Sequence, residues 1–142
     1  FFLKKAKKDK ATPELVRFCI EKALAFTTSE EHLRLLAEWI ENGKVVIEGE
    51  ELDVELTANQ KYAIIKMYWA HSAFSLDEKK SLRDKALADD MSDNAGNVRK
   101  VLDYTLPDAS LKERLWDEIL DDQSTCSLME IRLMIQGFAK VR

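Results

Sequence analysis

The sequence has few of the residues that interrupt helices, with 4 glycines and 2 prolines among 142 residues. Tight β-turns depend on glycine, so this composition leaves little material for a fold rich in hairpins. Hydrophobic residues make up 46% of the chain and charged residues 34%, a balance typical of globular proteins. We therefore predict a single all-α domain over residues 1–142, long enough to bury a core.

Cysteine is also scarce, because only Cys19 and Cys126 are present and they are far apart. This excludes a disulfide framework and a CxxC zinc knuckle, and we expect both to be small buried thiols on apolar helix faces. No stretch approaches about 18 consecutive apolar residues, and the lysine-rich start lacks the apolar region of a signal peptide. The sequence therefore predicts a soluble protein of a reducing compartment, the cytoplasm, with no membrane partner.

Positive charge is in deficit, with a net charge of -4 and a pI near 5.3. This argues against nucleic acid as a partner, because phosphate binding needs a clustered cationic surface. The exception is a lysine-rich N-terminal arm, residues 1–10, which contains LKKAKKDK. It could face an acidic partner, but a solvated or frayed chain end is the expected interpretation.

Helical periodicity recurs along the chain, and helix-capping residues separate the periodic segments. A first helix begins at Pro13 after the cap residue Thr12, and a second runs from about Ser29 to a stop at Gly43. Further helices are predicted at about 58–73, 76–88, 94–104, 109–120 and 127–140. The β-branched and acidic segment 44–56 is predicted to be an extended loop.

About seven helices joined by short loops form either a bundle or an α-solenoid. The helices differ too much for an exact repeat, so we predict an irregular, HEAT-like α-solenoid of antiparallel helix pairs. Such stacks present a curved surface that favours the binding of peptides or proteins.

Signatures of catalysis are missing from this chain: it has no HExxH, GxGxxG, GxxxxGK[ST] or GxSxG. The two histidines, His32 and His71, are expected to be an exposed polar residue and a packed or capping residue, respectively. Adjacent carboxylates such as Asp89-Asp90 are interpreted as solvated helix ends. An aromatic stripe could line a groove but is expected to belong to the core; it consists of Tyr62, Tyr68, Trp69 and Phe74.

Four segments carry a family resemblance: LLAEWIENG, YWAHSAF, ALADDMSDNAGN and LPDASLKERLWDEILDDQSTCSLMEIRLMIQGF. Together they resemble the C-terminal helical domain of the aminopeptidase N family of zinc aminopeptidases. In that family a helix ends W-x-x-x-G, and a later helix pair reads P-x-A-x-x-K-x-x-x-W and closes on I-x-G-F. The residues in these places are Trp39, Gly43, Pro107, Lys112, Trp116, Gly137 and Phe138.

The resemblance implies a non-catalytic domain of an enzyme that removes N-terminal residues from peptides. In that family the helical tail closes over the active site and contacts the distal part of the peptide, so the implied partners are a peptide substrate and the catalytic domain of the same polypeptide. Zinc is expected in that catalytic domain and no cofactor in this chain. Trp39, Trp116, Gly137 and Phe138 are expected to determine packing, and no catalytic or metal-binding residue is assigned.

The alternative hypothesis is a freestanding HEAT-like module for protein-protein interaction. The start at Phe1 and the end just after the I-x-G-F helix favour a fragment of a larger C-terminal domain. The two hypotheses predict the same fold, and they differ in the size and metal content of the native polypeptide.

Overall fold

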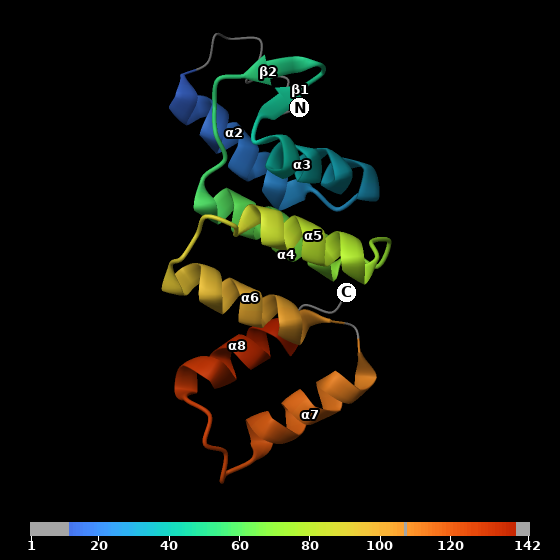
Figure 1. Ribbon diagram of the computed structural model, residues 1–142, viewed down its shortest axis with the longest axis vertical. Helices are drawn as coiled ribbons and strands as arrows, with labels where there is room; N and C mark the ends of the chain where they lie inside the picture. Colours follow the sequence, from blue (N-terminus) through green and yellow to red (C-terminus); the bar gives the residue numbers. More distant parts are fainter. Residues whose placement is uncertain (1–11, 107, 139–142) are drawn as a thin grey trace.

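A computed structural model describes residues 12–106 and 108–138 of the chain, and this part contains seven helices and one small hairpin (Figure 1). The all-α prediction is therefore confirmed. The elements in chain order are α2 (Pro13–Phe26), α3 (Glu30–Asn42), β1 (Val45–Ile47), β2 (Glu50–Leu52), α4 (Ala58–Ala70), α5 (Leu76–Ala86), α6 (Asp93–Thr105), α7 (Ala109–Leu120) and α8 (Leu128–Phe138).

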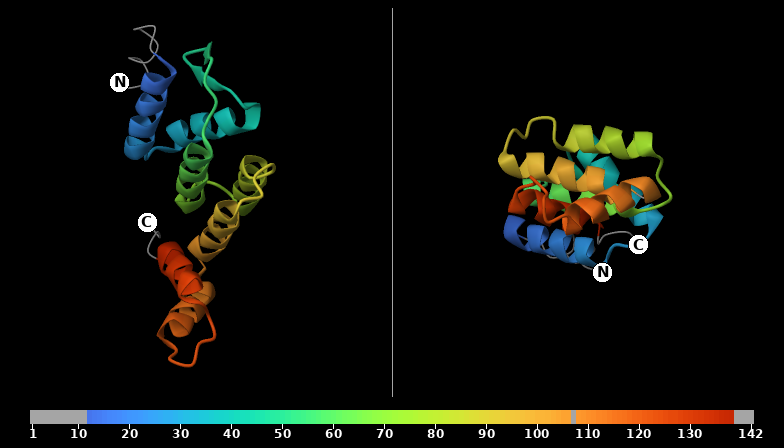
Figure 2. Two further views of the ribbon diagram at one scale, coloured as in Figure 1. Left: turned by 90° about the vertical axis from the view of Figure 1, so that its left-hand side faces the viewer. Right: turned by 90° about the horizontal axis from the view of Figure 1, so that it is seen from below.

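The helices are stacked along one long axis, with α2 and α3 at one end and α7 at the other (Figures 1 and 2). Alternate helices contact one another: α2 packs on α4, α4 on α6 and α6 on α8, while α3 packs on both α4 and α5. This contact between every second helix is the arrangement of an α-solenoid. The stack is irregular at its far end, where α8 packs chiefly on α6 and α7 lies against α8.

Short polar side chains begin the helices, as the sequence predicts. Thr12, Ser29 and Ser92 each accept a hydrogen bond from a backbone N–H in the first turn of the following helix. Thr57 and Ser75 form complete capping boxes, in which the side chain three residues later also accepts from the backbone N–H of the cap residue. These bonds satisfy donors that a helix leaves unpaired, so the boundaries are encoded locally.

The prediction of an extended loop at 44–56 is wrong for more than half of this segment. It contains an antiparallel hairpin in which Val45 pairs with Leu52 and Ile47 with Glu50. Glu48 and Gly49 both have positive φ, at 51° and 80°. Two successive residues of this kind form the tight turn that matches the twist of paired strands. The β-branched run before Gly49 is the sequence signal that predicts this hairpin. The turn between the strands contains a single glycine.

Helix α4 ends at Ala70, three residues before the predicted end at Ala73, because the chain turns back on itself. The turn brings Phe74 onto Tyr68, with ring centroids 3.6 Å apart and rings nearly parallel. The prediction that the aromatic stripe is core is confirmed, since all four of its side chains are buried. The core runs continuously from α2 to α6 and includes both strands.

Candidate functional site

Trp39 and Gly43 of the family pattern lie together at the end of α3, beside the hairpin. The Trp39 ring is 1% exposed, and its Nε1–H donates to the Val46 carbonyl oxygen at 2.8 Å. Gly43 follows the last helical residue with φ of 69°, the left-handed conformation that ends a helix. The glycine turns the chain toward β1, and the indole then fixes the first strand to α3.

Lys112 of the same pattern lies in α7, where its ammonium reaches the C-terminal ends of two other helices. Its Nζ donates to the Tyr104 carbonyl oxygen in α6 at 2.5 Å and to the Gly137 carbonyl oxygen in α8 at 3.2 Å. The last carbonyls of a helix have no partner within the helix and carry partial negative charge, so a cation there satisfies and stabilises both ends. Burial lowers the pKa of Lys112 from its usual value.

Gly137 lies directly beneath this lysine, at the closest approach of α6 and α8. A Cβ atom added to Gly137 would stand 2.4 Å from Tyr104 Cβ and 3.1 Å from the Val101 carbonyl oxygen. Only glycine therefore fits between the two helix backbones without moving them. The same helix turn carries Phe138, whose ring stacks on Trp116 with centroids 5.5 Å apart and lies 5.7 Å from Lys112 Nζ.

Four of the seven pattern residues thus meet at one place, which we name the α6–α7–α8 junction (Lys112, Trp116, Gly137 and Phe138, with Tyr104). Two others, Trp39 and Gly43, lie at the end of α3, and Pro107 falls outside the described residues. The contacts described for these six residues serve helix packing, helix capping or backbone conformation. The arrangement fixes the relative positions of the last three helices.

A surface groove between α2 and α4 has a volume of about 1150 Å³. Its lining is mixed: it includes the apolar side chains Leu24, Leu33 and Met67 and polar side chains such as Glu21 and Asn59. A lining of apolar and polar groups suits a peptide, whose side chains are often apolar and whose backbone needs hydrogen-bonding partners. We name this hollow the α2–α4 groove.

One side of the α2–α4 groove is held by a hydrogen-bonded network between α4 and the start of α6. The Tyr62 hydroxyl donates to Asp90 in a short hydrogen bond, and the Ser92 backbone N–H donates to the same carboxylate at 3.0 Å. The Ser92 hydroxyl, Tyr62 and the Ser92 backbone together lower the pKa of Asp90 to about 2. The bond to Asp90 in turn raises the pKa of Tyr62.

The structure therefore corrects the interpretation of Asp89-Asp90 as two solvated carboxylates, because Asp90 ties two helices together. The expectation for Cys126 is also wrong. It lies before α8 rather than on a buried helix face, and its half-buried thiol donates to Glu118 at 3.2 Å. That bond raises the pKa of the Cys126 thiol, so it is a poor nucleophile at neutral pH. Cys19 is buried, as predicted.

The histidines have the predicted local roles. His71 occupies the C-cap position of α4, where its Nδ1 accepts from the Ala73 backbone N–H at 3.3 Å and its ring lies 5.3 Å from Phe74. His32 is exposed in the first turn of α3, with its Nδ1 2.7 Å from the Ser29 hydroxyl. His71 is the only one of the two at the α2–α4 groove.

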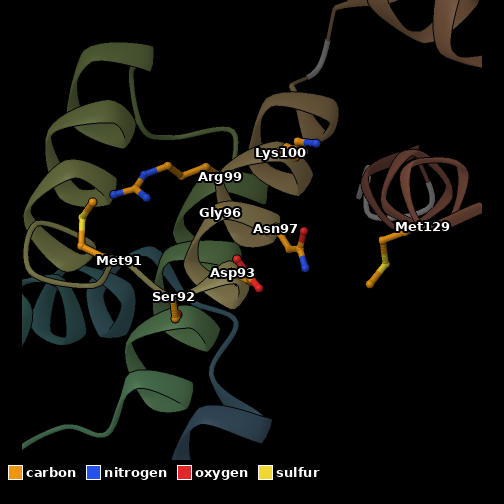
Figure 3. Close-up of a pocket in the computed structure, with 8 residues that line it drawn as sticks. All are labelled: Met91, Ser92, Asp93, Gly96, Asn97, Arg99, Lys100 and Met129. Atoms are coloured by element: carbon orange, nitrogen blue, oxygen red, sulfur yellow. The ribbon is translucent and has the colours of Figure 1, made fainter. Parts of the chain in front are cut away.

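A second, smaller hollow of about 600 Å³ lies beside the start of α6 (Figure 3). Most of its lining comes from α6 and the segment before it, and Met129 reaches it from α8. Its two cations are already engaged: Arg99 donates to the Leu87 carbonyl oxygen at 2.9 Å, and Lys100 pairs with Glu130 at 3.3 Å. This hollow offers a ligand less unpaired charge than its composition indicates.

Within residues 12–106 and 108–138, no three His, Cys, Asp or Glu side chains form a group suited to a metal ion. None of the described helices combines the length and apolar character needed to cross a bilayer.

Sequence reasoning missed Tyr104, Tyr62, Asp90 and Ser92 as determinants of these sites. Tyr104 carries no sequence signal for its role, since the approach of Gly137 depends on how two distant helices pack. The Asp90–Ser92 pair has a signal, because Asp-x-Ser before a helix is a common turn and capping arrangement. Nothing in the sequence indicates that Tyr62 completes it.

Comparisons with models of protein families, with curated proteins and with solved structures give no significant match to this chain.

Proposed function

We propose that this chain is the non-catalytic C-terminal helical domain of a zinc metallo-aminopeptidase that removes N-terminal residues from peptides. In this proposal the domain caps the active site of a catalytic domain in the same polypeptide and binds the distal part of the peptide. Zinc belongs to that catalytic domain, and the cytoplasm is the proposed location. The domain contributes binding and closure to the reaction, and no proton transfer or bond cleavage.

The observation that carries the proposal is the α6–α7–α8 junction. Lys112, Trp116, Gly137 and Phe138 match a family pattern, and the last lies 26 positions after the first. They come together around two helix ends in the structure. Lys112 and Trp116 lie one turn apart on α7, and Gly137 and Phe138 are adjacent on α8. Their meeting is therefore one contact between two helices, and this contact supports a shared architecture.

The α2–α4 groove supports the peptide-binding part of the proposal. It lies on the row of alternating helices formed by α2, α4 and α6, and residues from all three contribute to it. The Tyr62–Asp90 bond ties α4 to the segment before α6, and the Thr57–Gln60 capping box fixes the first turn of α4. A wall fixed in this way is preorganised, which lowers the entropy lost when a flexible peptide binds.

The first test is the mass and composition of the native polypeptide, isolated from its source cells with an antibody against this segment. The proposal predicts a protein several times larger than 16.4 kDa that yields HExxH-containing peptides and contains zinc. A native product close to 16.4 kDa without zinc would overturn it.

The second test locates the peptide. A photo-reactive phenylalanine analogue replaces Asn59, which is exposed at the α2–α4 groove, in the full native protein. The matched control places it at Lys80, which is exposed on α5 and does not line the groove. Illumination with a labelled peptide should give a crosslink from position 59 and not from position 80. Equal crosslinking at both positions would remove the groove from the proposal.

A freestanding interaction module is the second candidate, and the outer surface of α7 and α8 favours it. Trp116, Leu120, Leu128, Met129 and Ile135 are all exposed there, by 48–65%. Such a density of exposed apolar side chains is typical of surfaces that contact another protein. A native chain of the present size would favour this second candidate.

A further inference from the structure

Two exposed stripes on the last helix pair have complementary character. On α7 the stripe is Glu113, Trp116, Asp117 and Leu120, spaced i, i+3, i+4 and i+7, so all four lie along one side of the helix. On α8 the stripe is Leu128, Arg132 and Ile135, spaced i, i+4 and i+7. All seven side chains are exposed.

Each stripe is turned away from the interior of the molecule. On α8 the buried residues are Leu133, Met134 and Gly137, and the last of these faces α6 directly. At about 100° per residue, Leu128 and Ile135 lie on the opposite side of the helix. On α7 the only buried residue is Leu115, and Asp117 lies about 200° around the helix from it. Apart from the Trp116 ring, which stacks on Phe138 of the same chain, the described intramolecular contacts therefore leave both stripes uncovered.

The charges on the two stripes are of opposite sign. The α7 stripe carries two carboxylates, Glu113 and Asp117, next to its apolar residues. The α8 stripe carries one cation, Arg132, between Leu128 and Ile135. None of the ion pairs among the described residues includes any of these three. The α7 stripe of one copy can therefore place its apolar residues against those of the α8 stripe of another copy and its carboxylates against Arg132.

We propose that these stripes form an interface between two copies of this chain, with α7 of one copy against the α8 stripe of its partner. In a two-fold pair this contact occurs twice, so each copy supplies both halves. Leu120 and Ile135 bury apolar surface, while Arg132 meets Asp117 or Glu113 across the interface. The proposal does not depend on the aminopeptidase assignment.

Sedimentation equilibrium of the chain, over a wide range of protein concentrations, tests this directly. The expected result is a reversible shift from 16.4 kDa toward twice that mass as concentration rises. A mass that stays at 16.4 kDa throughout would overturn the proposal.

Variants identify the surface. Ile135→Glu and Leu120→Glu each place a charge among the apolar contacts and should weaken association by about tenfold or more. Leu15→Glu on α2, at the other end of the stack, is the matched control for an exposed leucine and should leave association unchanged. Association that resists both α7 and α8 variants would contradict this interface.

The ionic contact has its own test. Arg132→Glu and Asp117→Arg should each weaken association, and combining the two in one chain should restore it, because the reversed charges face each other again. All three proteins should keep the helical content and unfolding midpoint of the parent chain, since both side chains are exposed. A double variant that is weaker than either single variant would contradict the proposed pairing.

Discussion

Gly137 and Tyr104 come so close that a Cβ atom on the glycine would lie 2.4 Å from Cβ of the tyrosine and 2.9 Å from its backbone carbonyl carbon. Helices α6 and α8 therefore touch backbone to backbone at this point. The Lys112 ammonium binds a carbonyl on each of the two helices beside the contact. The glycine permits the approach, and the lysine stabilises the two helix ends that it brings together.

Replacing Gly137 with alanine should destabilise the domain by about 1–3 kcal/mol or more, because the added methyl group forces two helix backbones apart. Urea unfolding followed by circular dichroism measures this. Gly96→Ala is the matched control, since a Cβ there meets nothing within 4 Å. It should be neutral or stabilise by up to about 1 kcal/mol, because alanine favours a helix over glycine. Equal effects of the two variants would contradict the close approach.

Replacing Lys112 with methionine should destabilise the domain by about 1–3 kcal/mol, because two helix-end carbonyls lose a charged donor while the aliphatic stem is kept. The free energy of unfolding from urea titration is the readout. Lys112→Arg retains charge and donors and should cost less. If the methionine variant is as stable as the parent chain, the two hydrogen bonds do not contribute to stability.

Replacing Trp39 with phenylalanine should destabilise the domain by about 1–3 kcal/mol, because the buried ring loses volume and the Val46 carbonyl loses its donor. Trp116→Phe is the matched control, since that ring is 49% exposed and no described hydrogen bond involves its indole nitrogen. It should cost less than about 1 kcal/mol. Thermal unfolding by circular dichroism ranks the two variants, and the opposite ranking would contradict the role given to Trp39.

Replacing Gly43 with alanine should cost about 1–2 kcal/mol, because φ of 69° is disfavoured for residues with a Cβ. The space around Gly43 is open, so the cost is conformational and does not come from a clash. Gly43→Asn should therefore be milder, since asparagine tolerates this conformation. Equal unfolding free energies for the alanine and asparagine variants would indicate that backbone conformation is not the cause.

Acid should weaken the link between α4 and α6. Asp90 has a pKa of about 2 against an ordinary 3.8, owing to hydrogen bonds from Ser92 and Tyr62. A lowered pKa in the folded state means that the stabilisation is fully present above the ordinary value and is lost as pH falls toward about 2.

The measurement compares unfolding free energies of the parent chain and of Asp90→Asn between pH 7 and acid. The difference should be largest at neutral pH and shrink as the pH falls below about 4. Asp89→Asn is the control, because none of the described hydrogen bonds involves that side chain. A difference that does not change with pH would show that the Asp90 charge does not stabilise the fold.

Local sequence determined where the helices begin. The cap residues Thr12, Ser29 and Thr57 act on backbone groups within three residues, so a short window contains all the information needed. Gly43 ends α3 as predicted for the same reason. The periodic apolar positions likewise identify the buried faces of the helices, because burial follows the helical repeat.

Tertiary structure decided the features that depend on distant partners. The position of the hairpin 45–52 on α3 is fixed by the Trp39 indole, which bonds its first strand, and α4 ends early because Phe74 returns to Tyr68. The pattern residues Lys112 and Gly137 could be named from the sequence, but their shared contact with Tyr104 could not. That contact exists only because α6 and α8, separated in the chain by α7, pack against each other. Helical periodicity indicates which face of a helix is buried, but it does not indicate which other helix covers that face.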